Sequence, residues 1–195
     1  AASMAKAIEV NWPKNLPLNG RVITRYKHSI KTKKIKVFES GHPMPDTAGM
    51  KAANNFISKI SNLSKDDLLL CLISGGGSSL MSVPQKGLNM NDLRYVTKDL
   101  LNSGAEISEI NTVRKHLSKI HGGKIPTYTN AKIVSLIISD VTGNNITDIA
   151  SGPCCPDPTT FKKAIKILEK YKIKNKKIYG FLKNGVKGKI IENPK

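Results

Sequence analysis

Two continuously apolar runs of strand length stand out along the chain. They are "DLLLCLIS" (67–74) and "KIVSLIISD" (132–140). A strand without alternating polar positions is typical of a parallel sheet that is covered on both faces. Two shorter segments, "GRVIT" (20–24) and "IKVFES" (35–40), are further strand candidates because β-branched and aromatic residues are frequent in them.

Helical periodicity and capping residues predict helices in the intervening segments. Asp46 or Thr47 is the predicted cap of a helix that runs to Ile60, and Asn91 is the predicted cap of one that runs to Asn102. The other predicted helices cover residues 1–9, 78–81, 107–121 and 161–171. Apolar strands that alternate with helices predict an α/β layered fold with a mainly parallel sheet flanked by helices.

The first apolar strand leads into a glycine loop, "SGGGSS". Three glycines add nothing to a packed core, whereas bare backbone N–H groups can converge on an anion. The predicted anion-binding residues of this loop are Ser74, Gly75, Gly76, Gly77, Ser78 and Ser79. The alternative is a tight turn between a strand and a helix. The loop matches neither the P-loop nor the G-x-G-x-x-G fingerprint.

Asp140 closes the second apolar strand. Ligands of open α/β sheets bind beyond the carboxyl ends of the strands, so we expect Asp140 near the glycine loop. A carboxylate there could hold Mg²⁺ or orient a substrate hydroxyl for attack. It could instead cap its own loop through Gly143 or Asn144. His42, in "GHPMPD", either is structural or lines the same cleft.

The segment "EINTVRKHLSKIHGG" carries the third candidate group. On a helix, Asn111, Arg114 and Lys115 share one side, and their donors would suit a phosphate or a carboxylate. An ordinary exposed helix side is the alternative. We expect His116 and His121 at the surface or in capping positions rather than as general bases.

The net charge of +18 comes from 32 basic and 14 acidic residues. Lysine supplies 28 of the basic residues and arginine four, and 12 of the lysines lie in residues 162–195. A nucleic-acid site would need arginine forks and interleaved aromatic residues, which are scarce. A solvated lysine-rich surface is therefore favoured over a nucleic-acid interface, although its field would still attract small anions.

The sequence predicts a cytoplasmic protein. No apolar run approaches the roughly 20 residues that cross a bilayer, and there is no signal-peptide pattern. The three cysteines, Cys71, Cys154 and Cys155, show no C-x-x-C spacing, which fits a reducing compartment better than a disulfide framework.

Several long motifs occur together in this chain: "GHPMPDTAGMKAA", "LISGGGSSLM", "INTVRKHLSKIHGGK", "ISDVTGNNITDIASGP" and "PDPTT". In order and spacing they resemble the glycerate 2-kinases of the MOFRL-associated type, which also carry the label hydroxypyruvate reductase. The resemblance runs over residues 1–195. One departure is "SGPCCPDP", which has cysteines where relatives usually have threonine or valine, and this argues against a cysteine role.

The resemblance implies transfer of the γ-phosphoryl group of ATP to D-glycerate, giving 2-phosphoglycerate, with Mg²⁺ or another divalent cation. In such a kinase we expect Asp140 to be catalytic and to hold the metal, and Lys115 and Arg114 to be catalytic. Asn111 and the glycine loop would bind substrate or nucleotide. The resemblance also implies that residues 1–195 are an incomplete, Rossmann-like N-terminal domain. A glycine-lysine pair would precede Ala1 and a C-terminal MOFRL domain would follow Lys195, so we expect this fragment to be inactive alone.

Two other functions stay open at this point. One is a nicotinamide-dependent (NAD(P)H) hydroxypyruvate reductase, which would require a dinucleotide fingerprint that the sequence lacks. The other is a non-enzymatic, basic nucleic-acid-binding domain, whose binding would weaken steeply with salt. We expect small-molecule partners, neither nucleic acid nor membrane, and a possible homo-oligomer.

Overall fold

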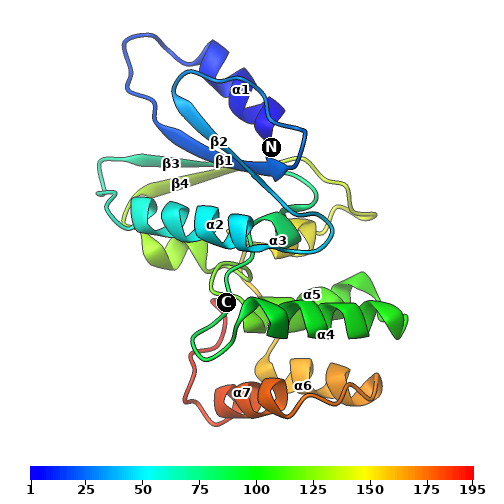
Figure 1. The fold of residues 1–195 in the computed structure, drawn as a ribbon. Helices are drawn as coiled ribbons and strands as arrows, with labels where there is room; N and C mark the ends of the chain where they lie inside the picture. Colours follow the sequence, from blue (N-terminus) through cyan, green and yellow to red (C-terminus); the bar gives the residue numbers. More distant parts are fainter.

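The computed structural model describes residues 1–195 as a layer of parallel strands with helices on both faces, continued by a stack of helices (Figure 1). The strands are β1 (Gly20–Arg25), β2 (Ile35–Ser40), β3 (Leu68–Ile73) and β4 (Lys132–Ile137). The α-helices are α1 (Ala2–Asn11), α2 (Thr47–Ile60), α3 (Gly77–Leu80), α4 (Met90–Asn102), α5 (Ile107–Leu117), α6 (Phe161–Lys170) and α7 (Lys176–Val186). Two short 3₁₀ helices are η1 (Ile125–Tyr128) and η2 (Ile149–Ser151).

The strands form two separate parallel pairs, β1 with β2 and β3 with β4. This confirms the predicted α/β class with parallel strands flanked by helices. A cleft of about 1440 Å³, named here the interstrand cleft, is lined by every residue of β1 and of β3. Helix α1 lies on one side of the strand layer and α2 on the other (Figure 1).

Helix α1 is tied to the strands by a carboxylate. Glu9 accepts backbone hydrogen bonds from Lys33, Lys34 and Ile35 at 2.6–3.2 Å, just where β2 begins. On the opposite side, Asp46 caps α2 through the amide of Gly49, as predicted. Helix α2 packs mainly against β2 and β1, and its buried Ala53 and Ile60 join a hydrophobic core with Cys71 and Ile73 of β3.

A second core lies among the helices. It joins buried side chains of α4, α5, α6 and α7, and its members include Leu100, Val113, Phe161 and Leu182. Helix α7 is absent from the predictions. Its sequence has apolar residues at helical spacing, and Ile178 and Leu182 are completely buried, but Gly180 and Gly185 weaken the helical signal.

Other boundaries differ from the predictions. Asn89 rather than Asn91 caps α4, because Asn89 and Asp92 form a reciprocal capping box. Helix α5 ends at Leu117 rather than at residue 121, since Ser118 turns to an extended conformation and bridges to Pro84.

The expected burial of the second apolar strand on both faces is wrong. Val134 and Leu136 of β4 are 46% and 44% exposed, because nothing in residues 1–195 packs on that face. No helix in the structure combines the length and apolar character that crossing a bilayer requires.

Candidate functional site

The candidate site lies where β3 and β4 end. These strands are parallel with Ile73 opposite Ile137, so the loops that follow them leave the same edge of the sheet. One is the glycine loop, residues 74–79, and the other begins at residue 138 and contains Asp140. Ser74, Gly75, Gly76, Gly77, Asp140 and His42 all line one end of the interstrand cleft.

Gly75 and Asp140 are in direct contact. A methyl group at position 75 would lie 1.8 Å from Oδ2 and 2.4 Å from Cγ of Asp140. Only a residue without a side chain allows this approach. The triple-glycine loop and the acid therefore share one side of the molecule, which is the arrangement that the sequence predicts.

At the other two positions of the loop, different neighbours require glycine. Gly76 has φ +80°, in the left-handed region, and a side chain there would meet the ring of His42 at 3.0 Å. A methyl group at Gly77 would lie 2.6 Å from Cβ of Ala150. Three neighbouring segments thus converge on a loop that has no room for side chains.

The glycine loop presents free backbone donors. The N–H groups of Gly75, Gly76, Gly77 and Ser78 donate to no backbone acceptor in the chain, and no side-chain acceptor reaches them. Successive backbone N–H groups around a left-handed residue form the concave surface that binds anions in many proteins. The loop can therefore accept phosphate or carboxylate oxygens.

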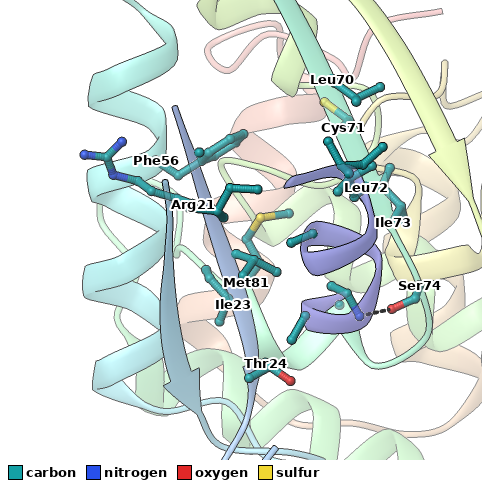
Figure 2. A pocket seen from close by; sticks show the side chains of 18 of the residues that line it. Arg21, Ile23, Thr24, Phe56, Leu70, Cys71, Leu72, Ile73, Ser74 and Met81 are labelled. Carbon is teal, nitrogen blue, oxygen red and sulfur yellow. Dashed lines mark hydrogen bonds between the residues drawn. The ribbon is translucent and has the colours of Figure 1, made fainter. Parts of the chain in front are cut away.

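The loop serines have different positions. Ser74 Oγ accepts a hydrogen bond from the amino group of Ala1 at 2.9 Å (Figure 2). Ser78 Oγ lies 2.7 Å from Ser151 Oγ, whose hydroxyl also donates to Asn111 Oδ1 at 3.0 Å. The buried Ser79 donates to the carbonyl of Gly76. Ser78 therefore joins the glycine loop to Asn111 of α5.

Asn111 holds the second loop rather than pointing to an open surface. Its Nδ2 donates to the backbone and side-chain oxygens of Asp148 at 3.3 Å, and the residue is only 2% exposed. Ser151, with φ +58°, was not predicted as a functional residue. It lies at the centre of this hydrogen-bonded chain, and no local sequence pattern marks it.

Arg114 lies behind the glycine loop, in a small polar pocket that also includes Ser78, Ser79, Ser118 and His121. Its Nε donates weakly to Thr97 at 3.5 Å, and it forms no ion pair. Burial lowers the pKa of Arg114, yet the group remains a cation. The volume of this pocket, about 10 Å³, is close to that of a single water site, so it has no room for a substrate group beside Arg114.

Lys115 is not brought to the glycine loop. Its Nζ lies 3.5 Å from Asp157 Oδ1, and the two side chains are 2% and 1% exposed. Asp157 also accepts from Asn193 at 2.6 Å and from Thr159 at 2.8 Å. Burial acts to raise the pKa of Asp157, but Asn193, Lys115 and Thr159 together outweigh it and hold the pKa below its usual value. The pair is a buried structural cluster.

The expected surface or capping positions of the two histidines are wrong. His116 is completely buried, bonded to the carbonyl of Thr112 and to Glu192. His121 is 1% exposed, and neither ring nitrogen has a hydrogen-bond partner in the chain. Burial, reinforced by the charge of Lys124, lowers the pKa of His121 to about 3, so the ring is neutral at physiological pH.

Lys124, another residue that the sequence did not single out, is also largely buried. Its Nζ donates to the carbonyls of Lys115 at 2.7 Å and of His121 at 3.0 Å. Burial lowers the pKa of Lys124 to about 7, although Asp157 and Glu192 partly oppose this effect. It braces the turn after α5 rather than the glycine loop.

A divalent cation fits the donor set at Asp140. The residue is exposed, and no ion pair in the chain includes it. Mg²⁺ is commonly held by one or two carboxylates together with substrate phosphates, rather than by a closed set of protein ligands. One free carboxylate beside an anion-binding loop matches that pattern, and the chain has no cluster of three metal-ligating side chains.

These features define an α/β protein with a candidate anion-binding loop at the carboxyl edge of its parallel strands. Residues 1–183 match the family described as "Domain of unknown function (DUF4147)". The chain therefore belongs to that family.

Known relatives agree with this assignment. The chain is 42% identical over 198 residues to a glycerate 2-kinase of Pyrococcus horikoshii, covering 100% of this chain and 44% of the relative. It is 47% identical over 174 residues to a protein of Agrobacterium vitis provisionally named a hydroxypyruvate reductase, covering 89% and 40%.

Two solved structures share the fold. A crystal structure of a Pyrococcus horikoshii protein superposes with TM-score 0.92 at 41% identity, covering 100% of this chain and 45% of that one. The crystal structure of glycerate kinase from Thermotoga maritima gives TM-score 0.82 at 39% identity, covering 91% and 42%. The chain thus spans less than half the length of these relatives.

Proposed function

We propose that residues 1–195 form part of an ATP-dependent glycerate 2-kinase, which transfers the γ-phosphoryl group of ATP to D-glycerate and yields 2-phosphoglycerate. The observation that carries the proposal is the contact between Gly75, in a loop of free N–H groups, and the carboxylate of Asp140. The names of the Pyrococcus and Thermotoga relatives support it.

The chain's own groups have separate roles in this proposal. The N–H groups of Gly75, Gly76 and Gly77 bind oxygens of a phosphate or of the glycerate carboxylate. Asp140 orients the attacking hydroxyl or holds the divalent cation, and it is the group that can accept the hydroxyl proton. A bound cation would supply charge neutralisation for the transferring phosphoryl group.

The remaining residues support the loop. Arg114 adds positive potential behind it, and Asn111 with Ser78 fixes the loops relative to each other. Lys115 acts from a distance, by holding the turn after α5 through its pair with Asp157. Phosphoryl transfer depends mostly on positioning and charge, so such fixed donors are what the reaction requires.

The same proposal includes the protein's setting. Residues 1–195 would be an incomplete, Rossmann-like N-terminal domain of a cytoplasmic enzyme, with ATP and D-glycerate as its partners. A homo-oligomer is compatible with it, and nucleic acid is not required. The scarcity of arginine and of aromatic residues supports the small-molecule assignment.

The test is a coupled ADP-release assay with D-glycerate and Mg²⁺, using the complete gene product that contains this chain. Turnover is expected, and Asp140→Asn should lower kcat by about 10²–10⁴-fold because the proton acceptor is lost. Asp66→Asn, a change at an exposed residue, is the matched control and should retain activity.

Three outcomes would count against the proposal. No ADP release with D-glycerate would refute the activity, and full activity in Asp140→Asn would refute the site. Oxidation of NADH with hydroxypyruvate in place of kinase activity would establish the reductase instead. The 195-residue chain alone should show no turnover, and activity there would show that further segments are dispensable.

A further inference from the structure

The strand layer is interrupted at one place. β1 pairs with β2 and β3 pairs with β4, but no ladder joins β1 to β3, which face each other across the interstrand cleft. Two-stranded sheets are marginal in water, and purely parallel sheets occur almost only as larger, covered sheets. The interruption leaves two unpaired strand edges inside the molecule.

The ladders show which backbone groups face the cleft. Ile138 donates to the carbonyl of Ile73, and Tyr26 donates to that of Ser40. Because the N–H and C=O of one strand residue point to the same side and alternate along the strand, the neighbouring residues point the other way. Those that face the cleft are Arg21, Ile23 and Arg25 of β1 and Leu68, Leu70 and Leu72 of β3.

The cleft is covered above and below by helices. Ala1, Ala2, Ala5 and Ile8 line it from α1 and its start, while Phe56 and Ile60 line it from α2. Figure 2 shows Phe56, Ile23 and Met81 turned towards the same space as Leu72 and Ile73. A segment placed there would be apolar on both of its faces, as in a central parallel strand.

The dimensions favour a peptide strand over a small molecule. Ligand pockets typically measure about 300–1,000 Å³, whereas this cleft measures about 1440 Å³ and follows both six-residue strands over their full length. Apart from the carbonyl of Arg25, which accepts from His28, these rows of N–H and C=O groups have no backbone partner in the chain. They require partners at the spacing of a peptide backbone, which a small apolar ligand does not supply.

We infer that the interstrand cleft is the place of one further β-strand, parallel to β1 and β3 and joined to the amino end of α1. Helix α1 starts beside the carboxyl end of β3, where the amino group of Ala1 contacts Ser74. A strand running with β3 reaches that point directly. It then forms a strand–α1–β1 unit, the ordinary crossover of parallel sheets.

The inserted strand would unite four strands into one sheet of five. Its carboxyl end would lie beside Gly75 and Asp140, so the residues that connect it to α1 would border the candidate anion site. The inference itself rests on the interrupted sheet, so it stands or falls independently of the proposed kinase activity.

The first test is residue-resolved amide hydrogen exchange on the 195-residue chain. In each strand, the amides that pair with the neighbouring strand serve as the control for the amides that face the cleft. Amides of Ile23, Leu70 and Leu72 should exchange at least about tenfold faster than those of Val22 and Cys71, which point to β2 and β4. Equal protection of both sets would mean that the cleft is closed in solution and would overturn the inference.

The second test adds a strand. An apolar extension of about six residues with a short glycine-serine turn is fused before Ala1, and a control extension carries two prolines in the strand. The apolar extension should slow exchange at Ile23, Leu70 and Leu72 and raise Tm, and the proline control should do neither. Gain of folded structure with the apolar extension alone, should the shorter chain fail to fold, is the same supporting result.

Three further results would overturn the inference. They are equal effects of both extensions, no effect of the apolar one, and protection that rises with protein concentration. The last would assign the cleft to a second copy of the chain. None of these readouts involves ATP or glycerate, so they remain distinct from the tests of the kinase proposal.

Discussion

Replacement of Gly75 by alanine tests the contact on which the candidate site depends. The added methyl group would lie 1.8 Å from Oδ2 of Asp140, whereas ordinary contacts begin at 3.4 Å. The carboxylate must therefore move away by about 1.5 Å or more to restore an ordinary contact. The backbone at position 75 does not have a positive φ, so the collision is the main perturbation.

The expected magnitudes differ for stability and for activity. Overpacking of a core costs about 1–3 kcal/mol, but Asp140 is exposed and can turn away, so we expect the free energy of unfolding to fall by less than about 1 kcal/mol. A displacement of about 1 Å in a catalytic group can cost about 100-fold in rate. The kcat for ADP release should fall by about that factor.

The assay uses the complete gene product, with kcat from coupled ADP release and stability from urea unfolding. Gly180→Ala is the matched control, because nothing lies within 4 Å of a methyl group at that exposed position in α7. It should leave kcat unchanged and raise stability by up to about 1 kcal/mol, the helix preference of alanine over glycine.

Turnover of the Gly75→Ala variant within about twofold of the unaltered protein would refute the reasoning. It would mean that the carboxylate of Asp140 has no required position. A loss of more than about 3 kcal/mol in unfolding free energy would also refute it, because the activity loss would then reflect unfolding of a rigid loop.

Three further predictions concern stability. Asp157→Ala should lower the free energy of unfolding in urea by about 3–5 kcal/mol, because it leaves Lys115 buried without a counter-charge. The pKa of His121 is about 3 in the folded chain and 6.5 ordinarily. Between pH 6.5 and pH 3 the unfolded chain therefore binds a proton on His121 that the folded chain does not bind. Stability should therefore fall as pH drops through that window, by up to about 1.4 kcal/mol per pH unit, and His121→Phe should flatten this slope. Asn89→Ala should cost about 1 kcal/mol, whereas Asn91→Ala should cost only a few tenths, because Asn89 is the cap of α4.

Each of these predictions has a matched comparison. Asp66→Ala, at an exposed position, should leave the urea midpoint unchanged, and His28→Phe should leave the acid slope unchanged. Equal losses for Asp157→Ala and Asp66→Ala, identical acid slopes for the His121 and His28 variants, or a larger loss at Asn91 than at Asn89 would contradict the respective prediction.

Local patterns predicted the features that depend on local physics. The four strands, α2 with its Asp46 cap, and the meeting of Gly75 with Asp140 follow from apolar runs, capping chemistry and the common edge of parallel strands. The spacing of Asn89 and Asp92 fits a capping box, so the cap of α4 was also predictable from the sequence, and the prediction of Asn91 is wrong.

Features set by distant contacts were not predictable. Helical periodicity predicts that Asn111, Arg114 and Lys115 share one side of α5, and that side was therefore interpreted as an anion site. It does not predict that Lys115 pairs with Asp157, because Asp157 lies 42 residues further along the chain. His116 and His121 look like surface residues locally, yet the later segments cover them. The missing ladder between β1 and β3 is a property of how the strands assemble, and neither strand's sequence predicts it.

The cluster of Lys115, Asp157 and Asn193 has an evolutionary consequence. These three buried polar side chains are one another's hydrogen-bond and ion-pair partners. Replacing one of them alone leaves a buried polar group without a partner, which lowers the stability of the fold. Among homologues, these positions should change together, with an aliphatic residue at 115 accompanied by loss of the acid at 157. An alignment in which they drift independently would show that the cluster tolerates far more than its geometry suggests.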